Sequence, residues 1–114
     1  MIRTKCYIAG KISGEDPDKV REKFLEAETK LRAVGFEVVN PIRLNNGTAG
    51  PWKESMKRCL PALLNCQYIL LLEDFNRSEG AKIEFMLAQA ARIHILFDRD
   101  IEWFGRHPEM LRHE

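Results

Sequence analysis

The sequence has little of what would mark a secreted, membrane-spanning or metal-binding protein. Only three of its 114 residues are cysteines (Cys6, Cys59 and Cys66), and no two of them have the CxxC spacing of a zinc or redox site. No apolar stretch approaches the roughly 20 residues that are needed to cross a bilayer. Residues 1–5 also lack the apolar segment of a secretory signal. We therefore expect a cytoplasmic protein with reduced thiols and no contact with membranes.

The net charge and the spacing of possible metal ligands argue against a binder of polymeric nucleic acid and against a metalloprotein. The 18 Lys and Arg residues balance 17 Asp and Glu residues, which gives a formal net charge of +1. A dedicated binder of polymeric nucleic acid usually carries a strong basic excess, so we expect no such partner, although a small anionic ligand is compatible. No His, Cys or carboxylate residues have metal-ligand spacing. We predict no metal, no other cofactor and no Ser-His-Asp catalysis.

What the sequence does contain is an alternation of apolar strands and amphipathic helices. Strands are predicted at residues 5–9, 36–40, 68–72 and 93–97. The clearest helix has Asp16 as its cap and Pro17 at its first position, and it ends at Gly35. The residues of its apolar stripe recur at steps of three and four: Val20, Phe24, Ala27, Leu31 and Val34.

This alternation predicts an α/β protein with one domain over residues 1–114. The expected architecture is a three-layer sandwich around a parallel sheet of about four strands. With right-handed crossovers the strand order is 2-1-3-4, as in flavodoxin-like or Rossmann-like folds. The ligand cleft of such a sheet lies where the winding direction reverses, between the first and third strands.

The middle of the chain gives weaker signals. Residues 42–50 are rich in turn formers and predict a loop. The next helix starts at Pro51-Trp52, and Pro61 is expected to kink or break it because proline removes a backbone donor.

Two more helices are predicted toward the C-terminus. A helix starts after Asn76 or Ser78 and is expected to bury one face, made of Ile83, Met86, Leu87, Ala90 and Ala91. Residues 98–114 predict a short helix. Its Trp103 and Phe104 either contact another subunit or cover the edge of the sheet.

Two glycine-containing junctions are the candidate site. The segment Gly10-Lys11-Ile12-Ser13-Gly14 follows the first strand, and its backbone N–H groups suit a phosphate or a sugar hydroxyl. It matches neither GxGxxG nor GxxxxGK[ST], and a plain turn is the alternative. At the second junction, Gly80 and Ala81 permit close approach of a sugar or base, while Ser78 or Asn76 caps the helix.

Glu84 and Tyr7 are the candidate catalytic pair. Glu84 lies in the first turns of a helix, at the margin of the expected apolar face, where a carboxylate is partly desolvated and suited to act as nucleophile or general base. Tyr7 lies on a strand expected to be central. Its hydroxyl either orients that carboxylate or only packs in the core.

Taken together, these motifs resemble the nucleoside 2-deoxyribosyltransferase-like family, in its small and mostly uncharacterised branch. The segment 7–14 resembles the family's Y-[IL]-A-G-P-[IF]-[ST]-G opening. Asn40-Pro41 matches the end of its second strand, 52–64 resembles its W…M…D-L helix, and 78–84 resembles its S-x-G-A-x-x-E signature. The resemblance covers about residues 5–97.

The resemblance implies a retaining displacement at the anomeric carbon of a 2-deoxyribosyl group. Glu84 attacks C1′ and expels the base, and water or a second base then resolves the covalent intermediate. Tyr7 hydrogen-bonds the nucleophile, and Lys11, in place of the usual proline, favours a phosphate. The substrate, a nucleoside or its 5′-monophosphate, is expected to contact Gly10, Lys11, Ile12, Ser13, Gly14, Asn40, Pro41, Trp52, Met56, Cys59, Asp74, Ser78, Gly80 and Ala81.

The sequence departs from the family pattern at two acidic positions. Cys59 and Gln67 stand where relatives carry aspartates, and a neutral thiol is a poor proton donor. Asp74 can substitute if its side chain turns into the cleft. Three hypotheses follow: an N-deoxyribosyl transferase or hydrolase, a nucleotide-binding or sugar-phosphate-binding module without turnover, and an interaction protein. The family often completes its sites with a neighbouring subunit, so we expect a homodimer or larger assembly.

Overall fold

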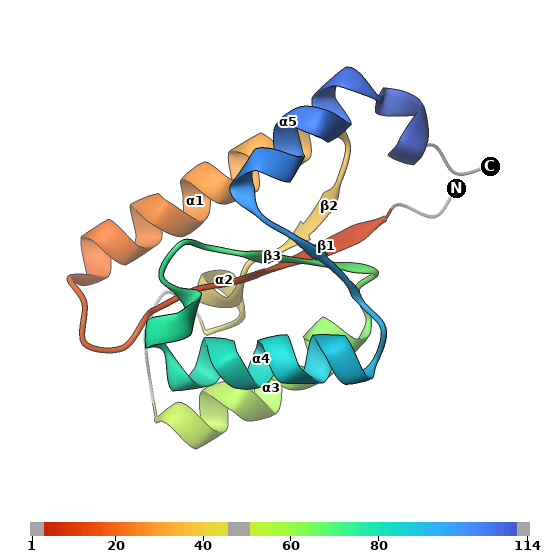
Figure 1. Ribbon diagram of the computed structural model, residues 1–114. Helices are drawn as coiled ribbons and strands as arrows, with labels where there is room; N and C mark the ends of the chain where they lie inside the picture. Colours follow the sequence, from red (N-terminus) through yellow and green to blue (C-terminus); the bar gives the residue numbers. More distant parts are fainter. Residues whose placement is uncertain (1–3, 46–50, 112–114) are drawn as a thin grey trace.

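The computed structural model describes residues 4–45 and 51–111, and its centre is a four-stranded parallel sheet (Figure 1). The strand order is 2-1-3-4, which confirms the predicted topology. In the register of the central strand, Tyr7 stands opposite Val39 on one side and Ile69 on the other. The strands are β1 (Lys5–Ala9), β2 (Glu37–Val39), β3 (Tyr68–Leu71) and β4 (His94–Leu96).

Helices cover both faces of the sheet and complete the predicted three-layer sandwich. In Figure 1, α1 and α5 lie on one face, and α3 and α4 lie on the other. Because both faces are covered, the strands are nearly continuous apolar runs. The helices are α1 (Pro17–Val34), α2 (Pro41–Leu44), α3 (Trp52–Leu64), α4 (Glu79–Ala90) and α5 (Asp98–Arg106), with 3₁₀ helices η1 (Phe75–Arg77) and η2 (Pro108–Leu111).

The central strand sends alternate side chains into two cores. Cys6 and Ile8 pack in the core shared with α1 and α5, whereas Tyr7 and Ala9 pack in the core shared with α3 and α4. This division follows from the two-residue period of a strand. All four side chains are fully buried. Tyr7 therefore lies under the same helices that carry most of the candidate site.

The predicted caps and apolar stripe of α1 are confirmed. The side chain of Asp16 accepts a hydrogen bond from the amide of Asp18 at 3.0 Å, and Pro17 is the first helical residue. Gly35 ends the helix with φ at 114°, a left-handed conformation that glycine adopts without strain. The stripe residues Val20, Phe24, Ala27 and Leu31 are buried, and Val34 is half-buried.

The prediction of a loop over residues 42–50 was wrong for its first part. Residues 42–44 belong to α2, because Asn40 caps that helix by accepting a hydrogen bond from the Ile42 amide at 3.0 Å. Four of the predicted turn formers, Asn46, Gly47, Thr48 and Gly50, lie outside the described residues.

Of the predicted kink or break at Pro61, the break was wrong, since α3 runs without interruption from Trp52 to Leu64. Proline deprives the carbonyl four residues earlier, that of Lys57, of its helical partner. Pro61 and Lys57 are both exposed, so water can take that hydrogen bond and the helix continues.

The predicted buried face of α4 was wrong. Ile83, Met86, Ala90 and Ala91 are exposed, and Leu87 is only half-buried. The face that packs on the sheet consists of Ala81, Glu84 and Ala88. Small residues let α4 approach the sheet closely, and the one long side chain among them is the carboxylate.

The C-terminal segment forms α5 and η2, which confirms the predicted short helix for the residues described. Phe104 is buried and makes edge-to-face contacts with Phe36 and Tyr68, with ring centroids 5.3 and 5.7 Å apart. It therefore covers one face of the sheet within the subunit. Trp103 is 39% exposed and stacks on His107.

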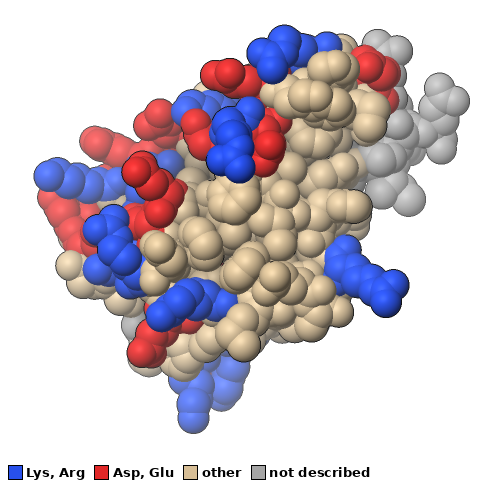
Figure 2. Space-filling model, viewed as in Figure 1, with Lys and Arg blue, Asp and Glu red and all other residues tan. Residues whose placement is uncertain are grey.

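Charged side chains are unevenly distributed over the surface. Figure 2 shows them gathered over the α1 side of the molecule, whereas uncharged residues cover much of the centre of this face. Among the described residues, no helix has both the length and the apolar character that spanning a membrane requires.

Candidate active site

A cleft lies at the edge of the sheet where the strands end, and most of the predicted site residues line it. Its walls come from the segment after β1, from the segment after β2, and from the N-terminal halves of α3 and α4. The cleft has a cavity volume of about 50 Å³ and is open to solvent. The predicted residues that line it are Gly10, Ile12, Ser13, Pro41, Trp52, Met56, Cys59, Ser78, Gly80, Ala81 and Glu84.

Four predicted substrate-binding residues do not line this cleft. Lys11 and Gly14 belong to the glycine-rich loop, but they are not among the residues that face the cleft. Asn40 is buried and donates a hydrogen bond to Glu28 on α1 at 3.1 Å. Asp74 lines a groove on the α1 side instead, together with Lys23 and other charged residues.

Glu84 is the one charged residue among the described residues that line the cleft. It lies on the buried face of α4 and is 6% exposed. Tyr7, which is fully buried on β1, donates its hydroxyl hydrogen bond to Oε2 of Glu84. The Glu84 side chain thus contacts the Tyr7 hydroxyl in the core and also borders the cleft.

Burial sets the pKa of both groups. It raises the pKa of Glu84 to about 7, and the hydrogen bond from Tyr7 acts in the opposite direction. Burial also raises the pKa of Tyr7 well above its usual value, and the neighbouring Glu84 and Cys59 add to this shift. Tyr7 therefore remains a protonated donor, and Glu84 changes charge near neutral pH.

Cys59 takes part in a small polar cluster on α3. Its Sγ lies 3.9 Å from the Ser55 hydroxyl and 4.0 Å from Nδ2 of Asn45. Asn45 donates a hydrogen bond to Ser55 at 2.9 Å, and Arg58 donates one to Asn45 at 3.0 Å.

Asn45 and Ser55 line the cleft, and sequence reasoning missed both. The sequence predicts Asn45 only as a turn former in a loop, and Ser55 stands one position before Met56 on α3. A helical projection of α3 would have found Ser55, because it shares a face with Cys59 four residues later. No sequence signal singled out Asn45.

Two glycines at the cleft have packing reasons to be glycine. A Cβ on Gly10 would lie 2.7 Å from Cδ1 of Leu72, so the central strand can enter its loop only without a side chain there. A Cβ on Gly80 would lie 3.3 Å from Nε1 of Trp52 and 3.5 Å from Sδ of Met56. Gly80 thus lets Trp52 and Met56 approach the start of α4.

The cap of α4 is Ser78, which settles the choice between Ser78 and Asn76. The Ser78 hydroxyl accepts a hydrogen bond from the amide of Ala81 at 3.1 Å. Asn76 instead belongs to η1. The Ser78 hydroxyl can still donate its own hydrogen to another acceptor, and the residue lines the cleft. In the described parts of the chain, no cluster of three His, Cys, Asp or Glu residues is arranged to hold a metal ion.

The family model of a domain of unknown function (DUF4406) matches residues 4–97 of the chain. This range contains every described residue that lines the cleft. No curated protein matches the chain.

Proposed function

The chain belongs to the family of the domain of unknown function DUF4406, and from that premise we propose that it is an N-deoxyribosyl transferase or hydrolase. Its substrates in this proposal are 2′-deoxynucleosides or their 5′-monophosphates. One observation carries the proposal: a buried carboxylate, Glu84, borders an open cleft and accepts a hydrogen bond from a tyrosine of the central strand. The resemblance of its motifs to nucleoside 2-deoxyribosyltransferases supplies the reaction.

In this reaction an Oε atom of Glu84 attacks C1′ of the deoxyribose. The bond between C1′ and the base nitrogen breaks, its electron pair leaves with the base, and the base takes a proton from solvent. Water or a second base then attacks C1′, gives up its proton, and returns Glu84 to its carboxylate form. Two displacements at one carbon retain its configuration, as in retaining glycosidases.

Other groups at the cleft suit the substrate. Peptide groups of Gly10, Ile12 and Ser13, with the Ser78 hydroxyl, offer hydrogen bonds to a sugar or its 5′-phosphate. Trp52, which is 46% exposed, presents an aromatic ring beside Met56 on which a base can stack.

A second candidate is a binding module of the same fold that has no turnover. One observation favours it: Glu84 is the sole carboxylate among the described residues that line the cleft. By the resemblance, Cys59 stands at a position where the transferase family carries an aspartate. Without a second acid, protonation of the departing base depends on solvent. The module in this case recognises a nucleotide or a sugar phosphate.

Incubation with deoxynucleosides and their 5′-monophosphates separates the two candidates. The enzyme releases free base, and mass spectrometry finds a deoxyribosyl adduct on the peptide that contains Glu84. Base release that survives in Glu84→Ala refutes the nucleophile. A raised melting temperature without base release supports the binding module, because a ligand of the native state alone stabilises it. Neither release nor stabilisation with any nucleotide overturns both candidates.

We extend the proposal to assembly and location from the same resemblance. The protein is a cytoplasmic homodimer or larger oligomer. Phe104 is buried within the subunit, so Trp103 is the remaining aromatic candidate for the interface. Sedimentation at several protein concentrations, with Trp103→Ser as the variant, tests the assembly.

A further inference from the structure

The glycine-rich loop after β1 has a second side, which faces α1 rather than the cleft. Both backbone groups of Lys11 are bonded there by side chains from distant parts of the chain. Its amide donates to Oδ1 of Asp74 at 3.0 Å, and its carbonyl accepts from Nζ of Lys23 at 2.9 Å. The two side chains also pair with each other, with Nζ of Lys23 2.6 Å from Oδ2 of Asp74.

Lys23 and Asp74 are held firmly in this arrangement, because their polar atoms already have partners. A lysine ammonium has three hydrogens, and Lys23 has three acceptors, because Glu15 lies 3.1 Å from its Nζ in addition to Lys11 and Asp74. Asp74 is 8% exposed. Burial by itself would raise the pKa of Asp74, but the Lys11 amide and the Lys23 ammonium lower it below its ordinary value. Asp74 therefore stays charged and bonded.

Lys11, whose backbone N–H and C=O groups are bonded in this way, lies between two residues that line the cleft. Gly10 precedes Lys11 and Ile12 follows it, and both face the cleft, as does Ser13. A shift of the Lys11 backbone would move these neighbours with it, because peptide planes are rigid. The side-chain pair thus controls the cleft wall without touching the cleft.

We propose that Asp74 and Lys23 are positioning residues that fix the Lys11 backbone so that Gly10, Ile12 and Ser13 meet the sugar of the substrate. This inference rests on the proposed function, and it gives Asp74 a different task from the substrate contact that the sequence suggested. Neither residue touches Glu84 or Tyr7, so both act on substrate binding more than on the displacement step.

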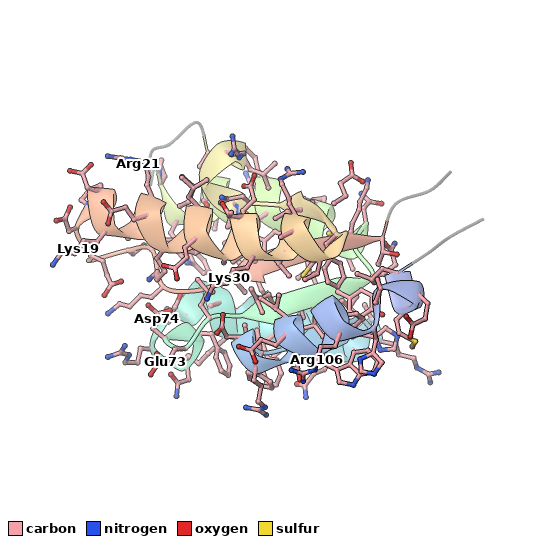
Figure 3. All side chains as sticks on the ribbon, turned by 90° about the horizontal axis from the view of Figure 1, so that it is seen from above. Lys19, Arg21, Lys30, Glu73, Asp74 and Arg106 are labelled. Carbon is pink, nitrogen blue, oxygen red and sulfur yellow. The ribbon has the colours of Figure 1, made fainter. Side chains whose placement is uncertain are left out.

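Lys30 offers a matched control on the same helix. It lies two helical turns after Lys23, borders the same groove, and pairs with Asp98 at 3.3 Å and Glu26 at 3.5 Å. Figure 3, which looks onto α1, shows Lys30 and Asp74 on the groove side of that helix. Its ion pairs include no residue of the glycine-rich loop.

The first experiment follows amide hydrogen exchange at Lys11, Ile12 and Ser13 in the protein without ligand. Asp74→Ala removes the acceptor of the Lys11 amide and is expected to speed its exchange at least about tenfold. Asp74→Asn keeps an acceptor oxygen and is expected to restore slow exchange. Lys30→Met leaves the loop as in the wild type. Unchanged exchange in Asp74→Ala overturns the inference.

The second experiment separates KM from kcat for release of the base. Lys23→Met is expected to raise KM about tenfold and to change kcat less than about threefold, since the groups that carry the displacement are untouched. Lys30→Met is expected to change neither. An equal fall of kcat in both lysine variants, or an unchanged KM in Lys23→Met, overturns the inference and leaves the proposed function standing. A wild-type protein that neither releases base nor binds any deoxynucleoside overturns the proposed function, and this inference with it.

Discussion

Two glutamates of this protein are almost equally buried and have opposite surroundings. Glu28, on the buried side of α1, is 4% exposed, and Glu84, on the buried side of α4, is 6% exposed. Glu28 accepts hydrogen bonds from Arg32 at 2.9 Å, from Arg43 at 3.0 Å and from Asn40 at 3.1 Å. Glu84 accepts a hydrogen bond from the neutral hydroxyl of Tyr7 and borders the cleft.

The difference in partners reverses the pKa shift. Burial tends to raise the pKa of Glu28, but the guanidinium groups of Arg43 and Arg32 and the amide of Asn40 lower it below its ordinary value. Burial raises the pKa of Glu84 to about 7, and Tyr7 offsets only part of that rise. A carboxylate neutralised by cations joins helices, here α1 to α2, whereas one held by a neutral donor at a cleft is available for reaction.

The largest expected effect comes from removing the carboxylate that the proposed function makes the nucleophile. Glu84→Gln keeps the shape of the side chain but cannot attack C1′, so base release is expected to fall more than about a thousandfold. Chromatography of the released base measures it. Glu28→Gln serves as the comparison and should keep most activity under conditions where it stays folded. Comparable losses in both variants would contradict the distinction between the two glutamates.

The next effect concerns how stability depends on pH. A carboxyl group titrates near 4.5 in the unfolded chain and near 7 at Glu84 in the fold, so between these values the native state binds more protons. The free energy of unfolding contributed by this group therefore falls as pH rises from about 4.5 to about 7. Glu84→Gln is expected to abolish this loss and to be more stable than the wild type at pH 8 by about 3 kcal/mol.

Urea unfolding at pH 5 and at pH 8 measures that difference. Glu28 acts in the reverse direction: its stabilisation is complete above the ordinary carboxyl pKa and is lost as pH falls through its lowered value in the fold. A Glu84→Gln variant whose stability changes with pH as much as that of the wild type would show that Glu84 has an ordinary pKa.

A smaller loss of stability is expected when the ion-paired glutamate is neutralised. Glu28→Gln removes the charge that faces two guanidinium groups, but the Arg43 side chain is 63% exposed and the Arg32 side chain 48% exposed. Water can therefore solvate both cations, and the expected cost is about 1–2 kcal/mol rather than the 3–5 kcal/mol of a fully buried pair. Urea denaturation at pH 7 measures it. If Glu28→Gln were more stable than the wild type, the ion pairs of Glu28 would contribute no net stability.

The smallest expected effect comes from removing the Tyr7 hydroxyl. Its hydrogen bond lowers the pKa of Glu84, which is the direction in which the partners of Glu28 act. Tyr7→Phe removes the hydrogen bond that lowers the pKa of Glu84, so this pKa rises further above 7. The rate of base release, which needs the ionised carboxylate, is expected to fall about tenfold at pH 7 and to recover at higher pH. The pH profile of kcat/KM measures the shift. A profile that keeps its wild-type midpoint would assign Tyr7 to packing alone.

The accuracy of prediction from sequence followed how local each signal was. The helix from Pro17 to Val34 was predicted with both ends because a cap, a proline and a glycine lie beside its apolar stripe. The buried face of α4 was not, because the large apolar residues Ile83 and Met86 are exposed while Glu84 is buried between two alanines. Periodicity alone cannot predict a helix that packs through small residues.

The candidate site divides in the same way. The residues of the two glycine-containing junctions were recognisable as short motifs, and most of them line the cleft. Asp74 was expected in the cleft and instead bonds Lys11 and Lys23 on the other side of the loop. That outcome depends on α1, which begins 57 residues before Asp74 in the chain.

The amino-acid sequence by itself determined the strands and the two glycine-containing junctions that border the cleft, because apolar runs, caps and glycines act over a few neighbouring residues. The strand order followed from the alternation of strands and helices with right-handed crossovers. Only the tertiary structure decided the state of Glu84. Its partner Tyr7 is 77 residues away in the chain, and its burial depends on how closely α4 packs on the sheet. The same side chain on an exposed helix would remain an ordinary carboxylate, since water would solvate its charge.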